Sequence, residues 1–358
     1  MKFVHMADMH FDAPFSLLNT KKNLGETRRL EQRNAFKEII NYIKEHNVEY
    51  FFIAGDLYEQ DYVRRSTIDF INDCFRQIPN TKIFITPGNH DPYIKDSYYE
   101  NYEFERNVYI FKTNKLEKYE DENVVIYGMA FTDYYMNTSA IKDLKVVRSG
   151  KPNILLIHAD VNGKRDENGY EYNSVPERSL KDTGFDYIAL GHIHKSNFEE
   201  NKDYVYPGST ISFGFDELGR HGFVAGEING GLLEKEFIEV DNRVFEEYFL
   251  NVDSFTSKEA LIEYILDIDF EKNHMYKLVL EGRRGFDIDE RDILKSISDK
   301  NILKIKNNTR ISYDLDALKK EKNLKGIFVK KVLEEAKSGY YTDEQIQKAI
   351  EIGLQAME

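Results

Sequence analysis

The first half of the chain alternates short apolar runs with longer amphipathic stretches, and this order restricts the fold more than any other feature. Runs rich in β-branched and aromatic residues predict strands; they cover residues 2–7, 49–54, 82–86, 124–129, 154–158 and 187–190. Between the first three of these runs, helical spacing of apolar residues predicts helices at 26–46 and 64–77. A β-α-β-α-β order of this kind is typical of a layered α/β core.

Beyond residue 191 the pattern changes twice. Strands are expected at 204–206, 222–228 and 232–240, and a boundary follows near 241–243. A small α+β unit is expected next, with strands at 245–252, 275–281 and 302–306 and helices at 257–266 and 289–297. Two tail helices are expected at 313–335 and 342–356, the second starting at the capping box Thr342-x-x-Gln345. We therefore expect three domains: 1–242, 243–310 and 311–358.

Composition excludes several classes of protein. Cys74 is the only cysteine among 358 residues, so no intrachain disulfide can form and a reducing compartment is expected. No apolar run approaches the roughly 18 residues of a membrane span. The first residues lack the pattern of a signal peptide, and a chain whose polar cluster begins at Asp8 is not expected to lose its N-terminus. A cytoplasmic protein without a membrane partner is the resulting prediction.

Charge gives a mixed indication. The formal net charge of -14 argues mildly against a protein that coats nucleic acid, because phosphate contacts usually come from a basic surface. Two bound divalent cations would offset four of these negative charges locally. Residues 304–331 carry nine Lys or Arg against three Asp or Glu. This segment is either a solvated helix face or a band that binds phosphate or a partner.

The polar residues that follow the predicted strands are the chemically informative part of the sequence. Asp, His and Asn residues stand directly after five strand ends, in the segments 8–10, 55–56, 88–91, 158 and 191–194. In open α/β sheets, ligands bind just beyond the carboxyl ends of the strands. The five segments are therefore expected to line one cleft.

The residue types in these segments favour a metal site. Mixed imidazole and carboxylate ligands suit Mn, Fe or Zn, whereas Mg and Ca prefer oxygen ligands alone. A carboxylate such as that of Asp56 can bridge two ions about 3.5–4 Å apart. Glycines at 55, 88 and 191 precede the candidate ligands and are expected to let the backbone turn tightly there.

The ordered set D-x-H, G-D, G-N-H-D, H and G-H-x-H, spread over about the first two hundred residues, resembles the signature of the calcineurin-like metallophosphoesterases. Each element alone could be a turn or a structural histidine, but five in order are a specific signal. The resemblance implies a four-layer α/β sandwich of two mixed β-sheets flanked by helices. It also implies that a small α+β capping domain and C-terminal helices follow this core.

The same resemblance assigns roles within the site. It implies two divalent ions, Mn²⁺ first with Fe or Zn as alternatives, which Asp56 bridges; Asp8, His10 and His194 would hold one ion, and Asn89, His158 and His192 the other. A hydroxide that bridges the metals would attack the phosphorus, and His90 would contact the scissile phosphate and assist the leaving oxygen. Glu59 stands where relatives carry an Asp that orients this histidine. The alternative for Glu59 is an ordinary solvated glutamate.

Three further stretches narrow the substrate. Residues 7–15, the Y-P-G-S at 206–209 and the E-x-G-x-x-G at 217–222 resemble bacterial DNA-repair exonucleases of the SbcD/YhaO type. This likeness implies hydrolysis of DNA phosphodiester bonds, by exonuclease and also single-strand endonuclease action, in repair or recombination. It further implies a partner for the C-terminal helices, an SbcC-like coiled-coil ABC-type ATPase. The sequence also leaves open whether the protein forms a homodimer.

Two competing functions use the same fold. One is a metal-dependent phosphatase or phosphodiesterase that acts on a small molecule or nucleotide, and the other is a binding module without catalysis. Phosphoprotein phosphatases carry an Arg shortly after the Gly-Asp motif, and this chain has none at 57–60. A binding module would show a broken ligand set, and none of the ligand positions is broken.

Overall fold

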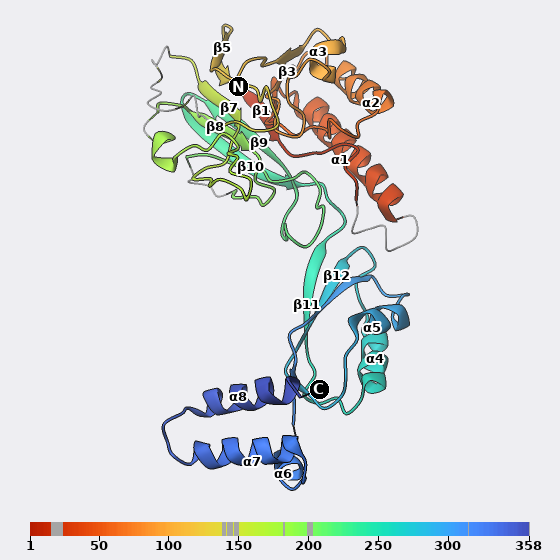
Figure 1. Cartoon of the computed structure of the whole chain (residues 1–358). Helices are drawn as coiled ribbons and strands as arrows, with labels where there is room; N and C mark the ends of the chain where they lie inside the picture. The colour runs from red at the N-terminus through yellow and green to blue at the C-terminus, as the bar shows by residue number, and fades with distance from the viewer. Residues whose placement is uncertain are drawn as a thin grey trace. The chain divides into compact units, whose positions relative to one another are not determined.

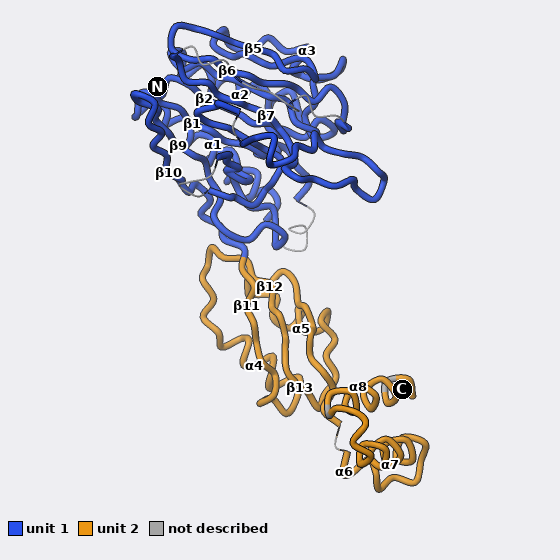
Figure 2. The backbone as a smooth tube through the Cα atoms, turned by 90° about the vertical axis from the view of Figure 1, so that its left-hand side faces the viewer, with its two compact units in different colours: residues 1–245 blue, residues 246–358 orange. Residues whose placement is uncertain are grey.

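The structure is a computed structural model that describes residues 1–15, 24–137, 141, 146, 150–181, 183–198, 203–313 and 315–357. The chain forms two compact units, residues 1–245 and 246–358 (Figure 2). No helix in the described part of the chain has both the length and the apolar content that a membrane span requires. The expected division into three domains stays a prediction.

The larger sheet of the first unit has six strands in the order β10-β9-β1-β2-β3-β4 (Figure 1). Its strands are β1 (Lys2–Met6), β2 (Tyr50–Ile53), β3 (Lys82–Ile85), β4 (Val108–Ile110), β9 (Gly222–Asn229) and β10 (Leu232–Glu239). The first four run parallel, whereas β9 and β10 pair antiparallel. The parallel strands therefore end along one shared edge of the sheet.

The second sheet has four strands in the order β5-β6-β7-β8. They are β5 (Glu117–Glu120), β6 (Val125–Gly128), β7 (Asn153–His158) and β8 (Tyr187–Gly191), with only β5 antiparallel to its neighbour. The two sheets bury one common core, in which Phe52 and Phe84 of the first sheet belong to the same cluster as Ile126 and Leu156 of the second. Burial of this apolar surface is the main stabilising contribution to the sandwich.

Helices flank this sandwich. They are α1 (Leu24–His46), α2 (Arg65–Arg76), the short α3 (Tyr98–Asn101) and the 3₁₀ turn η2 (Glu177–Ser179). The rings of Phe36 in α1 and Phe75 in α2 lie 6.1 Å apart, so the two long helices pack together beside the larger sheet (Figure 1). The predicted α/β fold of two mixed sheets flanked by helices is confirmed.

Some local predictions for the first unit were wrong. Strands β4 and β5 and helix α3 were not predicted, because each is only three or four residues long, and β5 and α3 carry polar residues. The expected strand at 204–206 is only an isolated bridge between Val205 and Ala189. The chain leaves the sheet there because Pro207 and Gly208 follow, the latter with φ +82°.

The second unit contains a three-stranded sheet in the order β11-β12-β14. The strands are β11 (Phe245–Asn251), β12 (Met275–Glu281) and β14 (Ile302–Asn307), and the helices of this part are α4 (Lys258–Asp267) and α5 (Glu290–Ser296). Leu261 of α4 and Ile293 of α5 join Leu278 of the sheet in one buried cluster. A two-stranded ribbon, β13 (Arg283–Arg284) with β15 (Arg310–Ile311), follows.

The tail forms three helices, α6 (Leu315–Leu318), α7 (Leu324–Ala336) and α8 (Asp343–Gln355). The expected single helix at 313–335 was wrong, because the chain leaves the helix between α6 and α7. Asn323 caps α7 by accepting a hydrogen bond of 2.9 Å from the backbone N–H of Gly326. The predicted capping box of Thr342 and Gln345 at the start of α8 is confirmed.

Candidate metal centre

The polar segments that follow the strands meet at one place in the first unit. Asp8 donates its backbone N–H to Gly55 O at 3.1 Å, and His10 donates to Asp56 O at 2.9 Å. Across the sandwich, His192 donates its backbone N–H to the carboxylate of Asp8 at 3.0 Å. The ends of strands from both sheets are therefore bonded directly to one another.

The predicted ligand atoms form two groups, and a third group of His10, Asp56 and His90 overlaps both. Those of Asp8, His10 and His194 lie within 4.8 Å of one another, and so do those of Asp56, His158 and His192. Asn89 joins the second group, because its Oδ1 lies 3.0 Å from His158 Nε2 and 3.1 Å from His192 Nδ1. All seven side chains expected as ligands thus share one site, and His90 and Glu59 adjoin it.

The backbone at the strand ends explains how the side chains are aimed inward. Asp8, His10, Asp56 and His192 have φ values of 51°, 48°, 51° and 105°, in the left-handed region that residues with a Cβ rarely adopt. Such conformations cost on the order of 1–3 kcal/mol each and cluster at functional sites. The first three turn the chain sharply at the end of a parallel strand.

The glycines that precede ligands have two different reasons to be glycine. Gly55 has φ +89°, so the expected tight turn is present there. Gly191 instead permits close approach, because a Cβ at this position would lie 1.8 Å from Ala54 O. A Cβ on Gly88 would lie 2.3 Å from Asp56 Oδ1. For these two residues the absence of a side chain lets the two halves of the site come together.

Three of the candidate ligand histidines have one ring nitrogen bonded to a fixed acceptor. His10 Nδ1 lies 2.7 Å from Glu59 Oε1, and His194 Nδ1 lies 2.8 Å from Glu217 Oε2. His158 Nδ1 lies 2.8 Å from the carbonyl oxygen of Ala54. An acceptor at Nδ1 places the proton there and leaves the Nε2 lone pair facing the centre. This is the usual arrangement of a histidine that binds a metal ion.

Two of the nitrogen atoms that face the centre repel each other without a cation. The Nε2 atoms of His10 and His194 lie 3.0 Å apart, and each carries a lone pair once Nδ1 holds the proton. His158 Nε2 faces Asp56 Oδ2 at 3.2 Å as well as the amide oxygen of Asn89. A cation coordinated by these atoms would convert the repulsion into bonding. The donor set therefore fits divalent metal ions.

Glu59 and His90 form a charged pair beside these groups. Glu59 Oε2 lies 3.0 Å from His90 Nδ1, so the one carboxylate holds both His10 and His90. Burial would raise the pKa of Glu59, but the hydrogen bonds from the two histidines lower it to about 2. Burial would lower the pKa of His90, but the Glu59 hydrogen bond and the charge of Asp56 raise it to about 9.

Asp91 is a buried support that the sequence did not single out. Its carboxylate accepts hydrogen bonds from the backbone N–H groups of Asp56, Leu57 and Gly88 at 3.0, 2.6 and 2.6 Å. The hydroxyl of Tyr99 also donates to it, at 2.7 Å. Asp91 thus holds the turn after β2 against the turn after β3. The sequence feature that could have indicated this role is the position of Asp91 at the end of the G-N-H-D motif.

Glu217 is a second such support, and it lies behind His194. Ser209 Oγ donates to Glu217 Oε2 at 2.9 Å, and the backbone N–H of Phe213 donates to Oε1. His221 contacts both, with Nδ1 3.0 Å from Ser209 Oγ and Nε2 2.8 Å from Glu217 O. The Y-P-G-S and E-x-G-x-x-G stretches therefore meet here, although the sequence alone gave neither a structural role.

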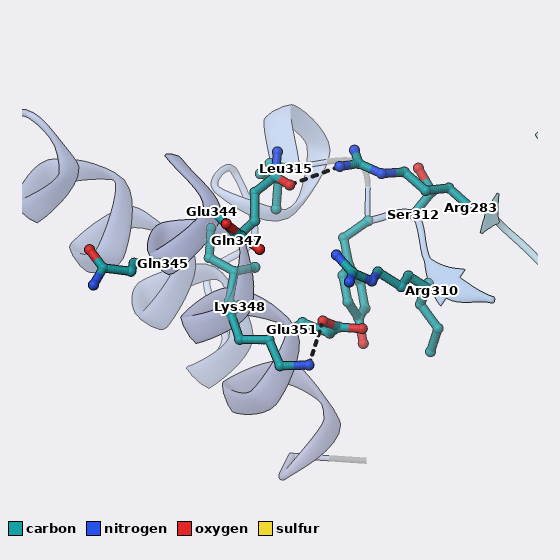
Figure 3. Close-up of a pocket in the computed structure, with 12 residues that line it drawn as sticks. Arg283, Arg310, Ser312, Leu315, Glu344, Gln345, Gln347, Lys348 and Glu351 are labelled. Carbon is teal, nitrogen blue, oxygen red and sulfur yellow. Dashed lines mark hydrogen bonds and ion pairs between the residues drawn. The ribbon is translucent and has the colours of Figure 1, made fainter. Parts of the chain in front are cut away.

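The second unit has a hollow of its own, but none of the candidate ligands lies in it. It measures about 450 Å³ and lies between the β13–β15 ribbon and α8 (Figure 3). Arg283 donates to Gln347 Oε1 at 2.8 Å, and Lys348 pairs with Glu351 at 3.3 Å. Basic and acidic groups alternate around it, which favours neither a metal ion nor an anion.

Comparison with known proteins decides the family. Residues 1–196, more than half of the chain, match the model of the calcineurin-like phosphoesterases. The chain belongs to this family. Calcineurin-like phosphoesterases hydrolyse phosphoesters with divalent metal ions, which agrees with the donor groups described above. The resemblance expected from the sequence is thereby confirmed, and the protein is a phosphoesterase.

Several members of this family are similar to the chain at low identity. Each is 24% identical: the uncharacterized metallophosphoesterase YhaO of Bacillus subtilis (75% of this chain, 67% of YhaO), the DNA double-strand break repair protein Mre11 of Methanopyrus kandleri (67% and 57%) and the SbcD subunit of the nuclease SbcCD of Staphylococcus epidermidis (66% and 69%). The chain thus spans little more than half of Mre11. The crystal structure of TT1561 of Thermus thermophilus covers 67% of this chain and 98% of its own, at 10% identity. Its TM-score of 0.36 is too low to bear on the fold.

Proposed function

We propose that the protein is a two-metal phosphodiesterase that degrades DNA from its ends, in repair or recombination. The observation that carries the proposal is the pairing of two groups of ligand atoms around Asp56. Its Oδ2 lies 3.6 Å from His10 Nε2 on one side and 3.2 Å from His158 Nε2 on the other. A buried carboxylate between two such groups suits a bridging ligand.

The proposal divides the donors between two ions as the resemblance to the family implies. Asp8, His10 and His194 would hold one ion, Asn89, His158 and His192 would hold the other, and Asp56 would serve both. Nitrogen and oxygen donors in this mixture favour Mn²⁺, with Fe or Zn as alternatives. When bound, the ions supply the positive charge that holds a phosphoester and lower the pKa of an attacking water.

His90 and Glu59 complete the chemistry from the protein side. The His90 side chain is about half exposed, so a substrate can reach it, and its Nδ1 is bonded to Glu59. We assign it the donation of a proton or hydrogen bond to the leaving oxygen, a contribution typically worth about 10²–10⁴-fold in rate. Glu59 fixes the orientation of the ring. An aspartate is shorter, and the extra methylene of Glu59 lets one carboxylate reach both His10 and His90.

The DNA substrate rests on the named relatives and on the two motifs behind His194. Mre11 is named as a DNA repair protein and SbcCD as a nuclease. The Y-P-G-S and E-x-G-x-x-G stretches, which resemble the SbcD type, form the support of a candidate ligand through Ser209 and Glu217. The likeness therefore extends to the part of the site that the general family signature does not include.

We also propose that the tail helices bind a coiled-coil ATPase, since the SbcCD relative is named as one subunit of a complex. Phe328 and Val332 of α7 pack against the buried cluster that α7 forms with α8. Leu324 and Ile327 on α7 are more than half exposed. An ATPase should bind the full chain and lose affinity for the double variant Leu324→Glu/Ile327→Glu; unchanged binding would contradict this surface.

One assay tests the main proposal. The protein with Mn²⁺ is given end-labelled DNA, bis-p-nitrophenyl phosphate and p-nitrophenyl phosphate in parallel. A DNA exonuclease shortens the DNA from an end and cleaves the diester faster than the monoester. Cleavage of the monoester with intact DNA would instead identify a small-molecule phosphatase and refute the proposal.

A further inference from the structure

The exposed tyrosines of the first unit are not scattered over its surface. In the described part of this unit, four tyrosines are exposed by 38% or more: Tyr62, Tyr134, Tyr135 and Tyr170. All four lie in loops that leave the carboxyl ends of β2, β6 and β7, the strand ends that surround the candidate metal centre. Solvent-exposed aromatic rings concentrated at one site are an indication of binding.

Three of these rings belong to two loops that are bonded to each other. Met136 donates its backbone N–H to Glu171 O at 2.8 Å, and Asn173 donates to Met136 O at 2.8 Å. These bonds join the loop of Tyr134 and Tyr135 to the loop of Tyr170. The three tyrosines therefore form one feature, which we name the tyrosine platform.

The platform is held against the metal centre at several points. The Asn173 amide donates to His158 O at 2.9 Å, and the ring of Tyr172 stacks on that of His192 with centroids 5.4 Å apart. The ring of Phe131, where the first loop begins, lies 5.6 Å from the ring of His158. Tyr134 follows Phe131 by three residues, and an extended chain spans at most about 3.6 Å per residue. Tyr134 is therefore tied closely to this contact.

The rings are arranged as a stack that can be extended. Those of Tyr135 and Tyr170 lie 4.3 Å apart with an interplanar angle of 26°. Each still exposes about two fifths of its surface, and Tyr134, which precedes Tyr135 in the chain, is exposed to a similar degree. A further planar ring can therefore stack on an outer face without displacing the pair.

A nucleobase is the planar ring that a phosphodiester substrate brings with it. In a duplex the bases cover one another except at the outer face of the last pair, so an unpaired or frayed strand offers far more free base faces. The net charge of -14 gives the protein no general attraction for phosphates, so another source of affinity is needed. Stacking on aromatic side chains supplies such affinity and tolerates any base sequence.

We propose that Tyr134, Tyr135 and Tyr170 bind the bases of an unpaired nucleic-acid strand whose phosphate occupies the metal centre. This inference rests on the proposed function and adds to it a preference for single-stranded over blunt-ended substrate.

The experiment compares the double variant Tyr135→Leu/Tyr170→Leu with the wild type, Tyr135→Phe/Tyr170→Phe and Tyr264→Leu. Leucine removes the aromatic faces and keeps apolar bulk, phenylalanine keeps the faces, and Tyr264 is an exposed tyrosine of the second unit. The probes are a fluorescein-labelled phosphorothioate oligothymidylate, which resists hydrolysis, and an abasic phosphorothioate strand of equal length. Fluorescence anisotropy gives the dissociation constants, and bis-p-nitrophenyl phosphate hydrolysis monitors the metal centre.

The leucine variant should bind oligothymidylate about 5- to 100-fold more weakly, the range for loss of one base stack. Its affinity for the abasic strand and its rate on the small diester should equal those of the wild type, as should all values for the other two variants. Equal affinity of the leucine variant and the wild type for oligothymidylate would overturn the platform, and so would an equal loss on the abasic strand. If the wild type cleaves the small diester and no nucleic acid at all, the proposed function fails instead.

Discussion

The two units of the chain differ in how firmly their noteworthy residues are fixed. In the first unit the candidate ligands are mostly buried, and backbone bonds such as Asp8 N to Gly55 O join the strand ends that carry them. In the second unit Leu324 and Ile327 are exposed on α7, a helix whose first turn is capped by the side chain of Asn323. The buried strand ends thus hold the candidate ligands in fixed positions, whereas the role of the exposed helix depends on the partner that binds it. Changes in the first unit should therefore alter catalysis, and changes in the second should alter stability or binding.

Removal of the metal ions should have the largest effect. A chelator should abolish hydrolysis of bis-p-nitrophenyl phosphate, and Mn²⁺ should restore it better than Mg²⁺, because imidazole and carboxylate donors suit the transition metal. In His158→Ala, metal analysis should find fewer bound ions, and Mn²⁺ should not restore the rate. Full activity in Mg²⁺ alone, after transition metals have been stripped, would contradict the ligand assignment.

His90→Ala should lower turnover by about 10²–10⁴-fold while the protein keeps its full complement of metal, because His90 is assigned to the leaving oxygen and not to an ion. Parallel rate and metal measurements on His90→Ala and His158→Ala check this. Should the first variant be depleted of metal and the second be fully loaded, the two roles are reversed.

Glu217→Gln should weaken Mn²⁺ binding by about 10- to 100-fold, the usual cost of losing a group that orients a metal-binding histidine. Glutamine has one acceptor oxygen, too few for the donors from His194, Ser209 and Phe213 that now meet at the carboxylate. Isothermal titration with Mn²⁺ measures the affinity, with Glu234→Gln on the exposed face of β10 as the control. An unchanged affinity would leave Glu217 with a merely structural role.

The smallest effect is expected in the second unit. Val329→Ala removes buried apolar volume between α7 and α8 and should lower the free energy of unfolding of that unit by about 1–3 kcal/mol. Ile327→Ala, on the exposed side of the same helix, should change it by no more than about 0.5 kcal/mol. Denaturant unfolding followed by circular dichroism checks both. Neither variant should slow diester hydrolysis. A large drop in rate would contradict the view that changes in the second unit leave catalysis unaffected.

The strand ends were predictable from the sequence because each combines a strong local signal with a motif. A run such as residues 154–158 is apolar until its last residue, and that residue is a candidate ligand. Signals of this kind need no knowledge of distant contacts, so both the sheet and the position of His158 within it could be expected.

Other features depend on contacts that a sequence does not display. Glu217 meets His194 from 23 positions away, and only the folded loop shows that its carboxylate lies behind the imidazole. The helix expected at 313–335 is interrupted because Asn323 caps a new helix. Weak strands such as β5, whose sequence is Glu-Lys-Tyr-Glu, form only because a neighbouring strand pairs with them.

Selection for folding alone would not keep side chains of these kinds at Asp8, His10, Asp56 and His192. Their left-handed backbone would be relaxed by glycine, which adopts positive φ without steric cost. Stability and activity are therefore opposed at these four positions, as they commonly are where strain is built into a site. A descendant of this chain that no longer needed hydrolysis would drift toward glycine here before its buried core changed. Glycine at these positions in a homologue would thus be a sign of lost catalysis in an intact fold.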